Sequence, residues 1–276
     1  EGLFHRRLSG HEAKAIIKHA YHSGIRAFDT AYSYREADSY LSAALREIHA
    51  PRDGVTIISK VMPVPTLERK AYASLRRLGT DFFDILLIHW PSDEASIFSS
   101  LRALERLKDK GIAREIGVSN FTPRLLRKYS SDFDISYHER ALSILWNKGW
   151  DEEREMGIRT IAYSPLCMGL LADREIDDRR SSLELCKAPS FPKAMESIRK
   201  LARDNGMRTE ELAISYAYSK GASFVVSGAS SPEQLSLLDS ARELDGDTLS
   251  ALDGIGHVIA EECTSDNIFS HVYDRI

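Results

Sequence analysis

The chain has 276 residues, of which 43% are hydrophobic and 28% charged, and its formal net charge at pH 7 is −4. This composition is typical of a folded globular protein with a sizeable apolar core. The slight negative charge argues against a nucleic-acid surface built on bulk positive charge, and no apolar run approaches the roughly 20 residues that cross a bilayer. We therefore expect no nucleic-acid partner and no membrane partner.

Short β-rich segments recur along the chain. In chain order they lie at residues 26–30, 55–60, 84–90, 114–120, 134–137, 159–164 and 223–228. Several contain continuous apolar runs, such as residues 85–88, which is typical of parallel strands covered on both faces. We therefore predict a parallel sheet.

Amphipathic segments alternate with these strands. Apolar residues recur at i, i+3, i+4 and i+7, the spacing of one helix face, in residues 13–20, 37–45, 67–78 and 194–202. Residues 231–234 predict a helix start, because a serine precedes a proline that would fall in the first turn. The polar stretch at residues 171–189 is predicted to be a loop.

The alternation of strands and helices predicts one α/β domain over residues 1–276, a (β/α)8 TIM-type barrel. A closed barrel of this kind needs eight strands, and the segments above supply seven. Residues 1–9 hold no convincing strand. We therefore predict that the first strand comes from residues upstream of Glu1, the alternative being a strand overlooked within the chain.

Cysteine usage bears on metals and on the compartment. The three cysteines, Cys167, Cys186 and Cys263, are far apart in sequence and form no C-x-x-C pair. An odd number of widely spaced cysteines favours neither a zinc site nor a disulfide framework. We expect no metal site and a reducing, cytoplasmic location.

Polar residues follow the apolar runs of six predicted strands. They are Asp29, Lys60, His89, Ser119 with Asn120, Tyr163 with Ser164, and Ser227 with Gly228. The carboxyl ends of the strands of a (β/α)8 barrel converge on one face, where the loops build the active site. The pattern predicts a functional site at that face.

Each of these residues taken alone also has a structural explanation. An aspartate after a strand often caps a helix, and a lysine at a strand end can be solvated. A histidine at the end of an apolar strand is often a hydrogen-bonded structural residue. Tyr34 could pack as a loop aromatic. The joint pattern, rather than any one residue, favours a site.

Five motifs in chain order resemble those of the aldo-keto reductase family, and together they span most of the chain. They are GIRAFDTA at 24–31 with Tyr34 and Glu36, LIHWP at 87–91, IGVSNF at 116–121, AYSPL at 162–166 with GLL at 169–171, and GAS at 228–230 before PEQL at 232–235. Each string is weak by itself, but five in the right order are specific.

The resemblance implies a catalytic tetrad of Asp29, Tyr34, Lys60 and His89. Hydride delivery to a carbonyl carbon leaves an alkoxide, which needs a proton that Tyr34 would donate. The ammonium of Lys60 would stabilise the resulting phenolate, and Asp29 would hold that ammonium. His89 would orient or polarise the carbonyl. We expect the four side chains to meet in one pocket.

The resemblance also implies a set of cofactor-binding residues. Ser119 and Asn120 would hold the nicotinamide carboxamide, Tyr163 would stack on the ring, and the backbone of Ser164 and Leu166 would lie near the pyrophosphate. A glutamine of the family usually follows the strand at 134–137, and we assign its position to Ser136. Residues expected near the adenosine phosphate are Ser227, Gly228, Ser230 and Gln234.

The identity of the cofactor, NADP(H) or NAD(H), is open at the sequence level. The family favours NADP(H), and its members that prefer NADPH usually place a basic residue near the last helix to bind the 2′-phosphate. This chain has serines and Gln234 there, and Leu237 and Leu238 where Glu and Asn are usual. Hydroxyl and amide groups lack the charge of an arginine fork.

Two functions are consistent with these residues. The first is an NAD(P)-dependent oxidoreductase that acts on a small aldehyde, ketone or sugar, or on the corresponding alcohol, with Tyr34 as general acid and base. The second is a regulatory or sensor barrel that binds a nicotinamide nucleotide with little turnover. The intact tetrad favours the enzyme, whereas the missing basic residue keeps the sensor as an alternative.

Overall fold

The structure of the protein is a computed structural model that describes residues 8–34, 36–173, 175–265 and 268. The chain forms two compact units. Unit 1 consists of residues 1–139 and 229–235, and unit 2 consists of residues 140–228 and 236–276. A single domain over residues 1–276 stays a prediction, as does a strand upstream of Glu1, and residues 1–7 lie outside the described part.

Unit 1 is built on parallel strands that pair in the order of the sequence. They are β1 (Ala27–Asp29), β2 (Thr56–Val61), β3 (Phe83–Ile88), β4 (Ala113–Ser119) and the first half of β5 (Tyr137–Ala141). The register pairs Lys60 with Leu87, Ile88 with Val118, and Ser119 with Glu139. The carboxyl ends of these strands therefore lie along one edge of the unit.

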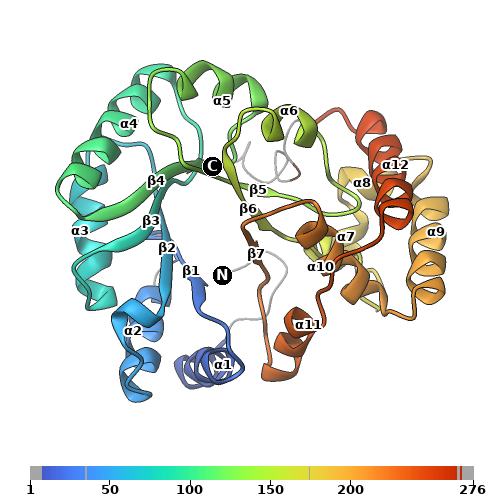
Figure 1. Ribbon diagram of the computed structural model, residues 1–276, viewed down its shortest axis with the longest axis horizontal. Coiled ribbons are helices and arrows are strands. Elements are labelled where there is room, and N and C mark those ends of the chain that lie inside the picture. Colours follow the sequence, from blue (N-terminus) through green and yellow to red (C-terminus); the bar gives the residue numbers. More distant parts are fainter. Residues whose placement is uncertain (1–7, 35, 174, 266–267, 269–276) are drawn as a thin grey trace. The chain divides into compact units, whose positions relative to one another are not determined.

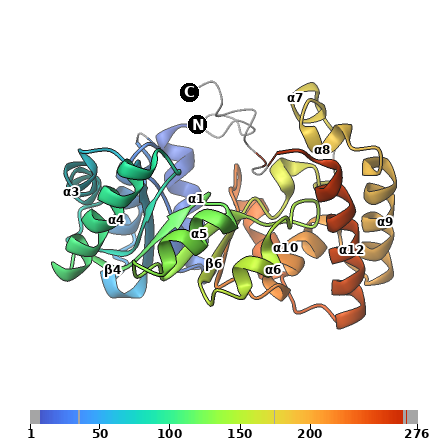
Figure 2. The same ribbon diagram turned by 90° about the horizontal axis from the view of Figure 1, so that it is seen from above.

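The helices of unit 1 follow the strands in alternation, as the sequence predicts. They are α1 (Gly10–His22), α2 (Ala37–Glu47), α3 (Leu67–Leu78), α4 (Glu94–Asp109) and α5 (Pro123–Ser130), with the 3-10 turns η1 (Arg52–Gly54) and η3 (Pro232–Leu235). Helices α3 and α4 lie against the outer side of β2, β3 and β4 (Figures 1 and 2). The outer face of these strands is thus shielded from solvent.

Local sequence fixes where these helices begin and end. The side chains of Ser9, Asp93 and Thr122 each accept a hydrogen bond from a backbone N–H in the first turn of α1, α4 and α5, respectively. Such caps satisfy donors that have no partner within the helix. Helix α3 ends at Gly79, whose φ of 67° lies in the left-handed region that glycine adopts without strain.

Unit 2 contains two parallel strands, β6 (Arg159–Tyr163) and β7 (Phe224–Val226). Its helices are α6 (Trp150–Arg154), η2 (Cys167–Gly169), α7 (Asp178–Ser181), α8 (Glu184–Lys187), α9 (Phe191–Asp204), α10 (Thr209–Ser219), α11 (Ser236–Asp239) and α12 (Gly246–Glu262). Helices α9 and α12 pack side by side (Figure 2). The prediction of a loop over residues 171–189 was partly wrong, because that stretch contains α7 and α8.

The position of β5 differs from the prediction. The sequence placed this strand at residues 134–137, but it runs from Tyr137 to Ala141, and all five of its residues are buried. Its centre is His138-Glu139-Arg140, which no hydropathy pattern marks as a strand. Charged residues can be buried here because the carboxylate of Glu139 meets Lys60 and the guanidinium of Arg140 meets Glu153.

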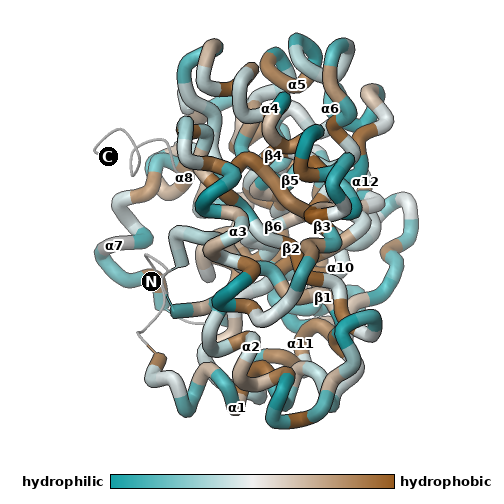
Figure 3. Tube along the Cα trace, turned by 90° about the vertical axis from the view of Figure 1, so that its left-hand side faces the viewer, coloured by the Kyte–Doolittle hydropathy of each residue, from teal (hydrophilic) through white to brown (hydrophobic). Residues whose placement is uncertain are grey.

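The centre of unit 1 is tightly packed. Leu86, Leu87 and Ile88 of β3 are fully buried, and this strand is brown over most of its length in the hydropathy colouring of Figure 3. Gly117 of β4 has no room for a side chain, since a Cβ there would lie 2.1 Å from the carbonyl oxygen of Tyr137. This glycine allows β4 and β5 to pair closely.

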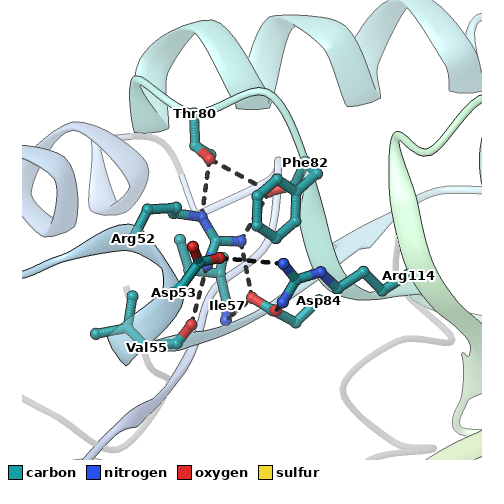
Figure 4. Close-up of polar contacts among 8 residues, drawn as sticks. All are labelled: Arg52, Asp53, Val55, Ile57, Thr80, Phe82, Asp84 and Arg114. Atoms are coloured by element: carbon teal, nitrogen blue, oxygen red, sulfur yellow. Dashed lines mark hydrogen bonds and ion pairs between the residues drawn. The ribbon is translucent and has the colours of Figure 1, made fainter.

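A polar cluster joins the amino ends of β2, β3 and β4 (Figure 4). The Asp84 carboxylate accepts hydrogen bonds from Arg52 at 2.7 Å, from Arg114 at 3.0 Å and from the backbone N–H of Ile57 at 2.8 Å. Both guanidinium groups also lie on the Phe82 ring, 3.9 and 4.1 Å from its centroid. One carboxylate thus ties three strands together.

We expect the substitution Asp84→Ala to lower the free energy of unfolding by about 2 kcal/mol, because it removes the carboxylate partner of Arg52 and the side-chain acceptor of the Ile57 N–H. Urea denaturation monitored by circular dichroism would measure the change. The control is Asp53→Ala, which removes an 84% exposed partner of Arg114 from the same cluster. Its effect should stay within about 0.5 kcal/mol, and equal effects of the two variants would contradict the prediction.

Candidate active site

The carboxyl ends of the strands in unit 1 carry the residues that the sequence singled out. Backbone hydrogen bonds continue past the ends of the strands. The N–H of Tyr32 donates to the carbonyl of Lys60, that of His89 to Val61, and that of Asn120 to Glu139, at distances of 2.8 to 2.9 Å. These bonds fix the direction in which each strand delivers its terminal side chains.

Lys60 lies at the centre of the site. Its side chain is 1% exposed, and its Nζ forms ion pairs with the carboxylates of Asp29, at the end of β1, and Glu139, on β5. The Nζ–Oε2 distance to Glu139 is 3.0 Å. Three strands thus contribute one ammonium and two carboxylates to one buried cluster.

The charges of this cluster perturb one another. Burial opposes a positive charge on Lys60, but the negative charges of Asp29 and Glu139 outweigh it and raise the pKa of Lys60 above its usual value. Burial raises the pKa of Glu139 to about 7; the charge of Asp29 adds to this rise, and Lys60 opposes it. Lys60 is therefore an ammonium at neutral pH, whereas Glu139 can be either protonated or ionised.

Tyr34 and His89 lie beside the ammonium. The Lys60 Nζ is 5.6 Å from the centroid of the Tyr34 ring, and the rings of Tyr34 and His89 meet edge to face with 5.5 Å between centroids. Tyr34 is 40% exposed, whereas His89 is buried. The structure therefore brings Asp29, Lys60, Tyr34 and His89 together, with the tyrosine on the solvent side.

His89 is a neutral imidazole. Burial, assisted by the positive charge of Lys60, lowers the pKa of His89 to about 3. Its Nδ1 lies 3.3 Å from the Oγ of Ser33. A neutral ring that accepts a hydrogen bond from the Ser33 hydroxyl at Nδ1 carries its own proton on Nε2, which can then donate a hydrogen bond.

Ser119 and Asn120 end β4 next to His89. Asn120 has a left-handed backbone with φ of 63°, and its side-chain amide donates to the carbonyl of His89 and to the Ser119 hydroxyl, both at 3.0 Å. Both residues are buried. A hydroxyl and a carboxamide held side by side can exchange hydrogen bonds with a primary amide.

Ser136 does not join this group. Its N–H pairs with the carbonyl of Ile116, and its hydroxyl donates to Glu115 at 2.9 Å and to Asp134 at 3.2 Å. It therefore lies at the amino end of β5, away from Ser119 and Asn120. The error has a physical cause: β5 begins later than predicted, and Glu139 is the residue of β5 that pairs with Ser119 at the carboxyl end of β4.

Sequence reasoning missed Glu139 as a site residue. The period-2 alternation of a strand that starts at Tyr137 places residues 137 and 139 on one face and 138 and 140 on the other. The available signal was a carboxylate three residues beyond the predicted position, in a strand that must pair with β4. The strand was not predicted at this position because hydropathy assigns ionisable residues such as Glu139 to loops.

The remaining predicted cofactor residues are distributed over both units. In unit 2, Tyr163 ends β6, Ser164 follows with φ of 54°, Leu166 precedes η2, and Ser227 and Gly228 follow β7. In unit 1, the N–H of Ser230 donates to the side-chain oxygen of Gln234 at 2.7 Å. In the stretch from Ser227 to Leu238 the sequence contains no lysine or arginine.

Within the described ranges, no three His, Cys, Asp or Glu side chains are grouped as metal ligands would be. The cysteines are free thiols, and burial raises the pKa of Cys167 to about 12, so it is protonated at neutral pH. No helix in the described part of the chain combines the length and apolar character needed to cross a bilayer.

Comparison with known proteins establishes the family. The profile described as the Aldo/keto reductase family matches residues 2–256. The chain belongs to the aldo/keto reductase family, and its parallel strands and alternating helices are those of the (β/α)8 barrel that the sequence predicted.

Individual relatives cover different shares of the chain. An aldo-keto reductase of Mycolicibacterium smegmatis is 34% identical over 175 residues, which are 60% of this chain and 62% of that protein. The methylglyoxal reductase DkgB of Escherichia coli O157:H7 is 31% identical over 196 residues, 63% of this chain and 69% of its own length. The chain thus spans about three fifths to two thirds of these relatives.

A solved structure shows the same fold. The aldo-keto reductase of Bacillus halodurans in its holo form superimposes with a TM-score of 0.78, covering 90% of this chain and 88% of that one. The two sequences are 22% identical.

We expect the imidazole of His89 to stay neutral between about pH 8 and pH 5, where a free histidine takes up a proton. The ring resonances of His89 in NMR spectra, assigned with a His89→Gln variant, would show no titration in that interval. The unfolded chain does bind this proton near its ordinary pKa of about 6.5. The native state should therefore lose stability as the pH falls from there toward 3. A midpoint near pH 6.5 for His89 would contradict the prediction.

Proposed function

We propose that the protein is an NAD(P)-dependent oxidoreductase that transfers a hydride between a nicotinamide cofactor and a small aldehyde, ketone or sugar. The observation that carries the proposal is the buried ammonium of Lys60, 5.6 Å from the centroid of the Tyr34 ring and beside the neutral imidazole of His89. This grouping supplies a proton donor, a charge that stabilises the donor's anion and a hydrogen-bond donor for a carbonyl oxygen.

Tyr34 is assigned the role of general acid in reduction. A phenol with an ordinary pKa near 10 donates a proton poorly at neutral pH, unless its anion is stabilised. The Lys60 ammonium supplies that stabilisation across a short, poorly solvated gap, and its two carboxylate partners keep it charged. In alcohol oxidation the same tyrosine accepts the proton.

His89 is assigned the role of orienting the substrate. Because its imidazole is neutral, it can donate a hydrogen bond from Nε2 to the carbonyl oxygen without bringing a second positive charge next to Lys60. The same oxygen then faces both the tyrosine hydroxyl and the imidazole. This arrangement favours a carbonyl compound small enough to place its oxygen beside both side chains.

The residues present fit a nicotinamide cofactor, which when bound would supply the hydride. Ser119 and Asn120 would hold its carboxamide, because they present a hydroxyl and an amide side by side at the end of β4, adjacent to His89. Tyr163, Ser164, Leu166, Ser227, Gly228, Ser230 and Gln234 remain assigned to the rest of the cofactor by the motifs that they belong to.

Small dicarbonyl compounds and NADPH are the first combination to test. The relative from Escherichia coli is named a methylglyoxal reductase, and other relatives include a glyoxal reductase of Bacillus subtilis. The absence of a basic residue between Ser227 and Leu238 favours weak discrimination between NADPH and NADH, since a 2′-phosphate would find no cationic partner in that stretch.

The assay follows nicotinamide absorbance with each cofactor and a panel that contains glyoxal, methylglyoxal, simple aldehydes and aldoses. Turnover above that of a heat-treated control supports the oxidoreductase. If fluorescence titration detects nucleotide binding but no member of the panel is turned over, the result would instead support the sensor. The absence of a basic residue between Ser227 and Leu238 is the observation that favours this second function. Neither binding nor turnover would refute both.

We expect Tyr34→Phe to lower kcat by about 10²–10⁴-fold, the usual contribution of general acid catalysis, with little change in nucleotide affinity. The substitution removes the donor proton and almost no contact area. The matched control is Tyr32→Phe in the same loop, whose ring packs 4.5 Å from the Arg77 guanidinium. This control should stay within about threefold of the wild type, whereas near-normal turnover of Tyr34→Phe would remove the assigned role.

A further inference from the structure

Glu139 is bound to the site through both its backbone and its side chain. Its carbonyl oxygen accepts the N–H of Asn120 at 2.9 Å, and its carboxylate accepts the Lys60 ammonium at 3.0 Å. The side chain of Glu139 is 4% exposed. The two residues that it contacts belong to two different parts of the proposed site, the cofactor side and the proton-donor side.

The cluster contains one more carboxylate than it has ammonium groups. Asp29 already pairs with Lys60, so an ionised Glu139 leaves the three groups with one net negative charge. A buried excess charge is costly, and a proton on one carboxyl group removes it. Burial raises the pKa of both carboxyl groups, that of Glu139 to about 7, so Glu139 has two alternative states beside one fixed ammonium.

Few other charges face this carboxylate. Within unit 1, Asp29 comes from β1 and Lys60 from β2, while the residue paired with Glu139 on β4 is the uncharged Ser119. Its neighbours on β5, His138 and Arg140, project from the opposite face of the strand because side chains alternate.

Arg140 is also neutralised by its own partner. Its guanidinium lies 2.7 Å from the carboxylate of Glu153, and both side chains are buried. Asp29 and Lys60 are therefore the charges that act on Glu139 directly.

We propose that Glu139 is a positioning residue for the proton transfer: it holds the Lys60 ammonium in place, and its protonation sets the net charge that the cluster presents to Tyr34. This inference rests on the proposed function. Glu139 acts through Lys60, whose ammonium it contacts, and not on the reacting atoms.

The direction of the effect follows from the charges. Burial raises the pKa of Glu139 to about 7, so the group is neutral on the acid side of that value and ionised on the alkaline side. When it is neutral, Asp29 and Lys60 balance and the Tyr34 phenolate meets no excess negative charge. When it is ionised, the extra charge disfavours the phenolate. Carbonyl reduction therefore slows as the pH rises through about 7.

The first test compares pH profiles of kcat for carbonyl reduction in the wild type, Glu139→Gln and Glu139→Asp. The wild-type rate should fall on the order of tenfold between about pH 6 and pH 8.5, the effect of one charge in a poorly solvated site. Glu139→Gln keeps the shape but not the charge, so that step should vanish. Glu139→Asp keeps an ionisable group, so the step should remain.

A second measurement needs no turnover. The tyrosinate absorbance of Tyr34 is isolated as the difference between each protein and its Tyr34→Phe counterpart during an alkaline titration. In Glu139→Gln this signal should appear at lower pH than in the wild type, by about one pH unit. The control is Asp84→Asn, which removes a carboxylate at the amino end of the same strands and should leave both the signal and the pH step unchanged.

The outcomes separate this inference from the proposed function. If no substrate is turned over but the tyrosinate signal shifts in Glu139→Gln, the inference about charge stands and the proposed reaction fails. If the wild type is active and Glu139→Gln shows the same pH step and the same tyrosinate signal, the inference is overturned and the reaction stands. Should Glu139→Gln not fold, Glu139→Met, which also lacks the charge, takes its place: a lost pH step supports the inference, and an unchanged step refutes it.

Discussion

The buried ammonium of Lys60 is the constraint on which the site in unit 1 depends. The Lys60 side chain is 1% exposed, so its charge needs partners of opposite sign, and the structure provides them from two other strands. Asp29 must end β1, and Glu139 must lie opposite Ser119, for both carboxylates to reach the same nitrogen. The register of the sheet therefore determines which charges meet at the Lys60 ammonium.

The clusters at the two ends of these strands differ in their charge balance and in their exposure to solvent. At the amino end, the carboxylates of Asp84 and Asp53 face the two guanidinium groups of Arg52 and Arg114, and the cluster is partly open to solvent (Figure 4). At the carboxyl end, two carboxylates face one ammonium in a buried setting. The charges of the first cluster balance, and water screens them. The second cluster has one excess negative charge, which a proton on one of its carboxyl groups removes.

The pairing of Tyr34 with a neutral histidine also follows from the ammonium. Lys60 repels a proton from His89 while burial disfavours a charged imidazole, so the ring remains a hydrogen-bond donor rather than an acid. The ammonium at the same time lowers the cost of a tyrosine anion. In the proposed function, one buried charge thus gives different roles to its two aromatic neighbours, and membership of the aldo/keto reductase family gives these roles a chemical context.

The sequence by itself determined the class of fold, the order of the parallel strands and three polar residues, Asp29, Tyr34 and His89, that lie beside Lys60. Apolar runs such as residues 85–88 mark a strand wherever it lies, and a polar residue that follows such a run must emerge at the carboxyl end of the sheet. Only the tertiary structure decided the limits of β5, and with them the removal of Ser136 from the site and the entry of Glu139. The reason is that Tyr137–Ala141 is buried by pairing its charges with Lys60 and Glu153, partners that lie 79 residues before Glu139 and 13 residues after Arg140. Hydropathy is a local property of the chain, whereas the neutralisation of a buried charge depends on contacts that exist only once the strands have paired.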